Sequence, residues 1–175
     1  GWYRVRDDAD PTLLQQYGLA WWRAGGAVIY RNEGPRFGLT AGAQGSGFES
    51  THTRAPVDGA EEYRNHGTKS EANGFVKLAW SDAGWHLLAD AQLRWARFGY
   101  SGDVGATAVD WTFFNPKLGV RRDLGKGLSL YASVGQTSRE PTRGDMLLGE
   151  DDATVWHDLT AVRPEKVTAV EVGAA

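Results

Sequence analysis

Apolar and polar residues alternate along most of the chain, and short groups of Gly, Asp and Asn interrupt the alternation. A period of two residues is typical of β-strands that have one apolar and one polar face. The pattern predicts about seven strands, which cover roughly residues 13–30, 37–50, 69–80, 85–100, 115–122, 128–139 and 165 to the end. We therefore predict an all-β fold of consecutive antiparallel strands.

Two kinds of connection alternate between these strands. Residues 31–36, 81–84 and 123–127 are short connections that are rich in turn-forming residues. The connections between them are long and polar, and they cover residues 51–68, 101–114 and 140–164. Outer-membrane barrels have tight periplasmic turns and long extracellular loops, so the strict order of short and long predicts a transmembrane β-barrel.

The hairpin around residues 81–84 shows the two faces most clearly. The odd positions of its second strand are apolar: Trp85, Leu87, Ala89, Ala91, Leu93 and Trp95. The even positions are mostly polar: His86, Leu88, Asp90, Gln92 and Arg94. A four-residue turn is expected to pair Trp80 with Trp85 on the apolar face. In the same way, Tyr30 is expected to face Phe37 across the preceding short turn.

The apolar face has the length of a membrane crossing. Trp85 and Trp95 lie at its two limits, and ten residues at roughly 3.3 Å each span about 33 Å. Tilted strands of this length give an apolar band about 25 Å tall, as between the aromatic girdles of outer-membrane barrels. We therefore predict that a membrane girdle is formed by Tyr30, Phe37, Trp80, Trp85 and Trp95. The alternative is a soluble β-sandwich whose Trp residues belong to an ordinary core.

The composition narrows the classes of function. The chain has 175 residues and a formal net charge of −3, so it lacks the basic field that attracts nucleic acid. It contains no Cys, which excludes disulfides and thiolate sites. The four His residues have no metal-ligand spacing, and the acidic clusters at residues 7–10 and 150–152 lack the spacing of a calcium loop. No nucleophile–base–acid set can be assembled, so we predict no enzyme, no metal site and no cofactor.

The second half of the chain contains three motifs: FFNPKLGV at residues 113–120, LSLYASVGQTSREP at residues 128–141 and PEKVTAVEVG at residues 164–173. Together they resemble TonB-dependent outer-membrane receptors. Residues 113–120 (FFNPKLGV) contain the Asn-Pro-Lys motif that commonly opens a descending strand in that family. Residues 128–141 (LSLYASVGQTSREP) are similar to its Leu-Tyr-Ala-Ser strand with an Arg-Glu-Pro exit into an extracellular loop. Residues 164–173 follow its Pro-Glu…Glu-x-Gly pattern, and residues 63–69 (YRNHGTK) also resemble the family. The motifs stand in the family's order and spacing.

The resemblance implies a plugged barrel of about 22 strands in the bacterial outer membrane, surrounded by lipid. It implies energy-dependent uptake of a scarce small molecule or metal chelate, such as a ferric siderophore, haem, cobalamin or oligosaccharide. The partner would be the inner-membrane TonB complex, which acts through the plug. We expect residues 1–175 to form part of the β-barrel domain, with the plug domain and the C-terminal barrel strands outside this sequence. Two rivals are a passive porin-type barrel and a secreted β-sandwich that binds carbohydrate.

Two places are candidates for contact with the plug or a ligand. Arg139 and Glu140 lie where a strand leaves the membrane, and Arg139 continues the polar face of the strand before it. The alternative for this pair is a local Arg–Glu contact at the rim. Asp110 and Trp111 belong to an aromatic-rich loop end, residues 109–114, which either contacts the ligand from outside or anchors the barrel at the outer interface.

Overall fold

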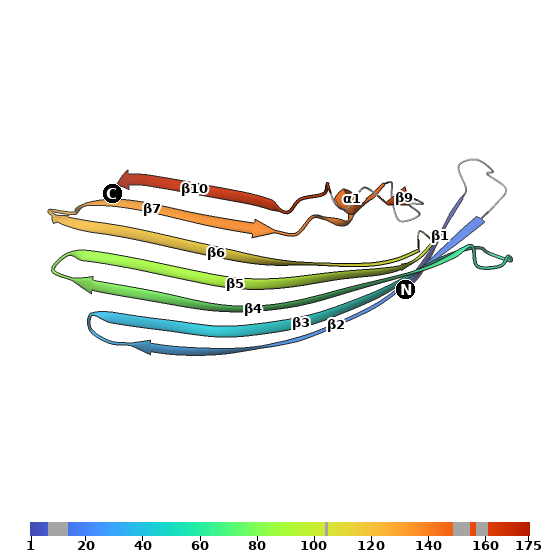
Figure 1. Cartoon of the computed structure of the whole chain (residues 1–175), viewed down its shortest axis with the longest axis horizontal. Helices are drawn as coiled ribbons and strands as arrows, with labels where there is room; N and C mark the ends of the chain where they lie inside the picture. Colours follow the sequence, from blue (N-terminus) through green and yellow to red (C-terminus); the bar gives the residue numbers. More distant parts are fainter. Residues whose placement is uncertain (7–13, 104, 149–154, 157–160) are drawn as a thin grey trace.

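The computed structural model describes residues 1–6, 14–103, 105–148, 155–156 and 161–175. Eight strands form one antiparallel sheet in the order β1-β2-β3-β4-β5-β6-β7-β10 (Figure 1). Their bounds are β1 Trp2–Arg6, β2 Leu14–Glu33, β3 Phe37–Pro56, β4 Tyr63–Asp82, β5 Trp85–Gly102, β6 Gly105–Gly125, β7 Leu128–Arg139 and β10 Glu165–Ala174. Between β7 and β10 lie α1 (Arg143–Met146), β8 (Leu147–Leu148) and β9 (Val155–Trp156), and the last two pair with each other.

The predicted all-β antiparallel architecture is confirmed, but the strands are longer than the alternation indicated. Residues 51–68 and 101–114 were expected to be loops, whereas β3, β4, β5 and β6 extend through most of them. Residues 51–54 (THTR) are polar on both faces, so the period of two disappears at the end of β3. In β6 the order reverses, because the inward residues Val109, Trp111 and Phe113 are apolar. The backbone pairing continues all the same. The five-residue strand β1 was missed because it is too short to show a pattern.

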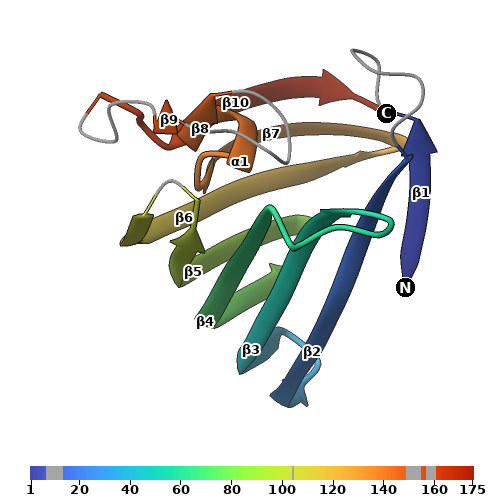
Figure 2. The same cartoon turned by 90° about the vertical axis from the view of Figure 1, so that its right-hand side faces the viewer.

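The sheet is a curved trough, seen from its end in Figure 2, with β1 and β10 as its two edges. The register puts most of the buried residues of the large sheet on one face, which is the inner face: Gln15, Ser50, Asn65, Asn73, Ala96, Tyr100, Phe113 and Ser129. The opposite, outer face exposes most of the large apolar side chains, among them Val28, Leu78, Leu87, Leu118, Val134, Val170 and Val172. The trough is therefore apolar outside and largely polar inside.

A β-sandwich does not fit this arrangement. The other sheet in the described residues, β8 with β9, has two strands of two residues each, too small for the second layer of a sandwich. None of the helical segments in the described part of the chain is long and apolar enough to cross a membrane. The segment after β7 folds inward and places Met146 and Leu147 against Tyr100, which forms a small apolar cluster on the inner face.

The hairpin between β4 and β5 corrects the predicted register. Ala83 and Gly84 have φ values of 45° and 79°, so they form a two-residue turn with both residues in the left-handed region. Asp82 therefore pairs with Trp85, and Trp80 pairs with Leu87. The prediction that Trp80 faces Trp85 is wrong by two residues along the ladder. Because a shift of two preserves the face, both Trp side chains still lie on the outer face.

The first hairpin departs from the prediction in the same way. Tyr30 pairs with Ala41, and Phe37 pairs with Trp80 of the next strand. Tyr30 and Phe37 therefore share the outer face without facing each other. The turn covers residues 34–36 and not the predicted residues 31–36, because β2 continues to Glu33.

Neighbouring glycines on β2 provide a test of the packing between β2 and β3. A Cβ at Gly25 would lie 2.8 Å from the carbonyl oxygen of Gly45 and 2.8 Å from Cβ of Ser46, whereas one at Gly26 would meet no atom within 4 Å. Gly25→Ala is therefore expected to destabilise the folded full-length protein by about 1–3 kcal/mol, the usual range for overpacking. The measurement is the temperature at which the folded form converts to the unfolded form on a gel.

Gly26→Ala is the matched control, because it makes the same chemical change one residue away on the open face. It is expected to leave the conversion temperature unchanged. Equal conversion temperatures for the two variants would show that β2 and β3 do not approach each other as closely as described.

Candidate functional site

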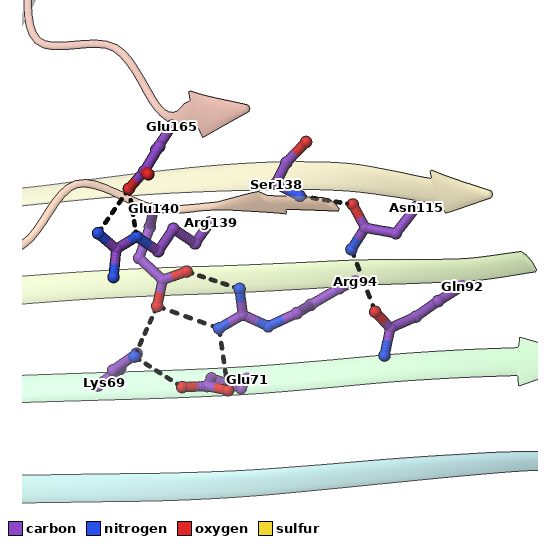
Figure 3. A network of polar contacts seen from close by, with 9 residues as sticks. All are labelled: Lys69, Glu71, Gln92, Arg94, Asn115, Ser138, Arg139, Glu140 and Glu165. Carbon is purple, nitrogen blue, oxygen red and sulfur yellow. Dashed lines mark hydrogen bonds and ion pairs between the residues drawn. The ribbon is translucent and has the colours of Figure 1, made fainter. Parts of the chain in front are cut away.

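Four charged side chains form a cluster on the inner face, which we call the lumenal ion cluster: Lys69, Glu71, Arg94 and Glu140 (Figure 3). Glu140 accepts hydrogen bonds of 2.6 and 3.0 Å from Arg94 and lies 2.6 Å from Nζ of Lys69. Glu71 lies 2.8 Å from Lys69 and 3.1 Å from Arg94. Each cation thus bridges both carboxylates, and the cluster as a whole is electrically neutral.

The strand register explains how the cluster assembles. Lys69 and Glu71 are two residues apart on β4, so both side chains point to the inner face. Arg94 on β5 pairs with Asn73, which puts its long side chain on the same face within reach of Glu71. Glu140 comes from a different part of the chain, the first residue after β7. The cluster therefore ties the start of the connection between β7 and β10 to the wall formed by β4 and β5.

The Glu140 carboxyl group is strongly perturbed. The hydrogen bonds from Arg94, followed by that from Lys69, lower the pKa of Glu140 to about 2, although partial burial opposes the shift. The side chains of Glu140 and Arg94 are only 12% and 17% exposed. Glu140 is therefore charged at neutral pH, where it can pair with both cations.

A second set of polar contacts involves Asn115, the first residue of the Asn-Pro-Lys motif. The β6–β7 ladder runs to the pair formed by Lys117 and Gly135, next to Pro116, which has no backbone N–H to donate. Beyond this point the Asn115 side chain connects the strands. Its Oδ1 accepts a hydrogen bond of 2.9 Å from the backbone N–H of Ser138, and its Nδ2 donates one of 3.1 Å to Gln92 on β5 (Figure 3).

The two neighbouring candidates Arg139 and Glu140 go to different partners. Arg139 pairs with Glu165 of β10 at 2.5 Å, and both side chains are exposed (Figure 3). The alternative prediction, a local contact between Arg139 and Glu140, is therefore wrong. Arg139 pairs with a different glutamate, and Glu140 turns inward to the lumenal ion cluster. Contact of either residue with a plug or ligand stays a prediction.

Asp110 and Trp111 lie within β6 and not at the end of a loop, so their predicted location is wrong. The cause is the unexpected length of β6, which already begins at Gly105. Asp110 pairs in register with Arg97, and Trp111 points inward and packs beside the apolar cluster around Tyr100. A ligand contact by either residue stays a prediction.

The predicted girdle residues lie on the outer face in two groups. Phe37, Trp80 and Trp85 lie near the short-turn end of the sheet, and so does Tyr30. Trp95 lies ten residues farther along β5, beside Thr112 of β6. This placement agrees with the spacing used to predict the girdle, and their position at the membrane interface stays a prediction.

A small, partly open pocket lies next to the lumenal ion cluster, with Lys69 in its lining. Its volume is about 270 Å³, and its walls include the aromatic residues Phe48, Phe98 and Tyr100. Ser50, His52 and Asn65 add polar groups. Sequence analysis missed this pocket and also Lys69, Glu71 and Arg94 as a site. The alternation along β4 and β5 places Lys69, Glu71 and Arg94 on the inner face. It does not predict that Glu140 turns inward to meet them.

The described residues contain no group of three or more His, Asp or Glu side chains arranged to hold a metal ion. The acidic clusters at residues 7–10 and 150–152 lie outside the described residues, as does His157. The charged side chains of the lumenal ion cluster are donors and acceptors to one another.

A long-stranded, curved antiparallel sheet with an apolar outer face and a polar, ion-paired inner face is the wall of an outer-membrane β-barrel. More closely, the chain belongs to the family described as TonB dependent receptor-like, beta-barrel, which matches residues 2–175. Members of this family reside in the bacterial outer membrane and are not enzymes.

Solved structures show the same fold. The chain is similar to the unliganded ferric citrate transporter FecA (TM-score 0.69, 14% identity), covering 93% of this chain and 26% of that one. It is similar to the copper transporter OprC (TM-score 0.74, 15% identity), with 92% and 29% covered. It is also similar to the alcaligin outer-membrane receptor FauA of Bordetella pertussis (TM-score 0.60, 12% identity), with 93% and 28% covered. The chain thus spans less than a third of these proteins' length. Among curated proteins, none matches the sequence.

Glu140→Gln is expected to release the segment after β7 from the inner wall. Gln cannot form the ion pairs with Arg94 and Lys69, and the loss of a charge-assisted hydrogen bond costs about 1.5–3 kcal/mol. A spin label attached through Gly144→Cys, at an exposed position in α1, reports the mobility of this segment in the full-length protein. The label is expected to become more mobile in the Glu140→Gln background.

Glu165→Gln is the control, because it removes an exposed pair on the neighbouring strand and should leave the label unchanged. Acid provides a second readout. Since the pKa of Glu140 is lowered from 4.5, its contribution is present above pH 4.5 and is lost as the pH falls toward 2. The unmodified background should thus gain label mobility over that range, whereas Glu140→Gln should gain less. Equal mobility in both backgrounds at neutral pH would refute the anchoring role.

Proposed function

We propose that the protein containing this chain is an energy-dependent outer-membrane importer of a scarce nutrient. Residues 1–175 supply part of its barrel wall, and a plug elsewhere in the protein fills the lumen. The proposal is supported by membership of the TonB-dependent receptor family. The partner is the inner-membrane TonB complex, which acts on the plug to release the nutrient into the periplasm.

One structural observation carries the proposal beyond family membership: the segment after β7 folds onto the inner wall. Glu140 anchors it through Arg94 and Lys69, and Met146 and Leu147 bury themselves beside Tyr100. This segment lies on the inner wall at the end of the sheet opposite the short turns, where it occupies part of the lumen. It lies beside the aromatic pocket at Lys69, which gives a capture surface facing the lumen.

The nutrient is a small molecule or metal chelate. Ferric citrate, copper and alcaligin are what the similar solved structures are named for, and they share only the fold with this chain. The candidate classes that the family resemblance implies are ferric siderophores, haem, cobalamin and oligosaccharides. Copper is a further candidate, because one similar structure is named as a copper transporter. The pocket favours a ligand with a ring and neutral oxygen atoms, because its walls are aromatic and the neighbouring charges already neutralise one another.

Energy dependence separates an importer from a porin. Radiolabelled ferric citrate, haemin, cyanocobalamin, copper and maltooligosaccharide are each presented to the parent strain and to a strain lacking the gene. Loss of the gene is expected to abolish accumulation of one probe, and a protonophore is expected to abolish the same accumulation. Gene-dependent accumulation that survives the protonophore would establish the passive porin instead.

Arg139→Ala tests the predicted contact at the strand exit. Uptake of the identified probe is expected to fall about tenfold, consistent with losing one charge-assisted hydrogen bond of about 1.5–3 kcal/mol, while the barrel still assembles. Glu165→Gln is the control, because it removes the partner of Arg139 and retains the guanidinium. A loss specific to Arg139→Ala assigns the contact to the plug or ligand, and equal losses in both variants would assign it to the pair between strands.

A further inference from the structure

The outer face carries an apolar groove near the short-turn end of the sheet. It is shallow and open, and its volume is about 670 Å³. Large side chains from six strands border it, namely Phe37, Leu78, Trp80, Leu87, Leu118, Val120, Val134 and Val170. Ala89 and Ala132 contribute only methyl groups to the same face, which leaves room between the larger neighbours. The groove is thus a hollow in the surface that the barrel presents to the membrane.

Arg122 lies at the end of this groove. Arg122 is the next outward residue after Val120 on β6, and it pairs in register with Trp85, the next outward residue before Leu87 on β5. The Arg122 guanidinium stacks over the Trp85 ring at 4.9 Å from its centroid and donates a hydrogen bond of 2.5 Å to the carbonyl oxygen of Ala83. These two contacts hold the guanidinium at the level of the short turns.

The charge of Arg122 is not neutralised within the described part of the chain. Its partners there are the Trp85 ring and the Ala83 carbonyl group, and neither carries a negative charge. The nearby outward carboxylate, Asp82, pairs with Arg36 at 3.2 Å. The neighbouring Arg121 differs, since it points to the inner face and pairs with Asp123 at 2.8 Å. Arg122 therefore presents an unmatched positive charge where an apolar groove meets the membrane surface.

We propose that this groove and Arg122 form a binding site for an anionic phospholipid of the periplasmic leaflet. The acyl chain lies in the groove, and the phosphate of the headgroup accepts hydrogen bonds from Arg122. Short turns of outer-membrane barrels face the periplasm, where the leaflet consists of phospholipids. Basic residues at the interface attract anionic headgroups, and aromatic rings lie at the same depth. The site is independent of the proposed transport, because it uses the opposite face of the wall.

The test is native mass spectrometry of the purified full-length protein, equilibrated with equal amounts of phosphatidylglycerol and phosphatidylcholine. The unaltered protein is expected to retain phosphatidylglycerol preferentially. Arg122→Gln is expected to lose that preference by about tenfold, consistent with one charge-assisted hydrogen bond. Arg121→Gln is the matched control, because it removes the same charge one residue away on the inner face, and it should keep the preference.

A second variant tests the groove separately from the charge. Ala89→Phe fills the hollow with an apolar side chain, which a lipid-facing position tolerates, so the barrel should still assemble and convert on heating. It is expected to lower retention of phosphatidylglycerol with Arg122 intact. Equal retention of both lipids by the unaltered protein, or equal effects of Arg121→Gln and Arg122→Gln, would overturn the proposal. A dimer that Ala89→Phe dissociates would overturn it too, since a second copy would then occupy the groove.

Discussion

The continuous ladder of backbone hydrogen bonds is the constraint on which the rest of this structure depends. Within a membrane no water is available to satisfy an N–H or C=O group, so each strand must pair along its whole length with its neighbours. Strands of 18 to 21 residues from β2 to β6 meet this requirement with a register that shifts nowhere between them. Because the pleat has a period of two, this constant register sorts every side chain to one face. The apolar outer face and the ion-paired inner face both follow from it.

The sequence predicts the face of a residue far better than its partner. Trp80 and Trp85 were assigned correctly to the outer face although their pairing was wrong, because an error of two residues in register does not change parity. Strand ends are harder to predict, as the extensions of β3 and β6 show. Alternation reports the contrast between lipid and lumen. Beyond the lipid this contrast is lost in β3, and in β6 it reverses, because Trp111 and Phe113 point inward and are apolar.

The candidate site was predictable only in part for a similar reason. Arg94 and Lys69 fall on the polar face by parity, and Arg139 and Glu140 were recognised from the motif at the end of a strand. No local pattern shows that Glu140 crosses to Arg94, 46 residues earlier in the chain, while Arg139 turns to Glu165. Which partner each of these two side chains takes depends on the three-dimensional arrangement of the strands. An exposed pair such as Arg139 with Glu165 contributes about 0–1 kcal/mol, whereas removal of one partner of the partly buried pair would leave a charge uncompensated.

The departure of Glu140 from the sheet has a cause in the strand before it. Pro116 has no N–H group, and the β6–β7 ladder runs no farther than Lys117 and Gly135, four residues before β7 ends. From there β7 is held on one side by its ladder with β10, and on the other by side-chain contacts such as that of Asn115. A strand that remained paired on both sides would carry its next residue onward along the sheet. Because the backbone of β6 releases β7 early, the chain is free to turn inward at Glu140, where Arg94 and Lys69 fix it. The Asn-Pro-Lys motif therefore shapes the mouth of the barrel as much as its wall.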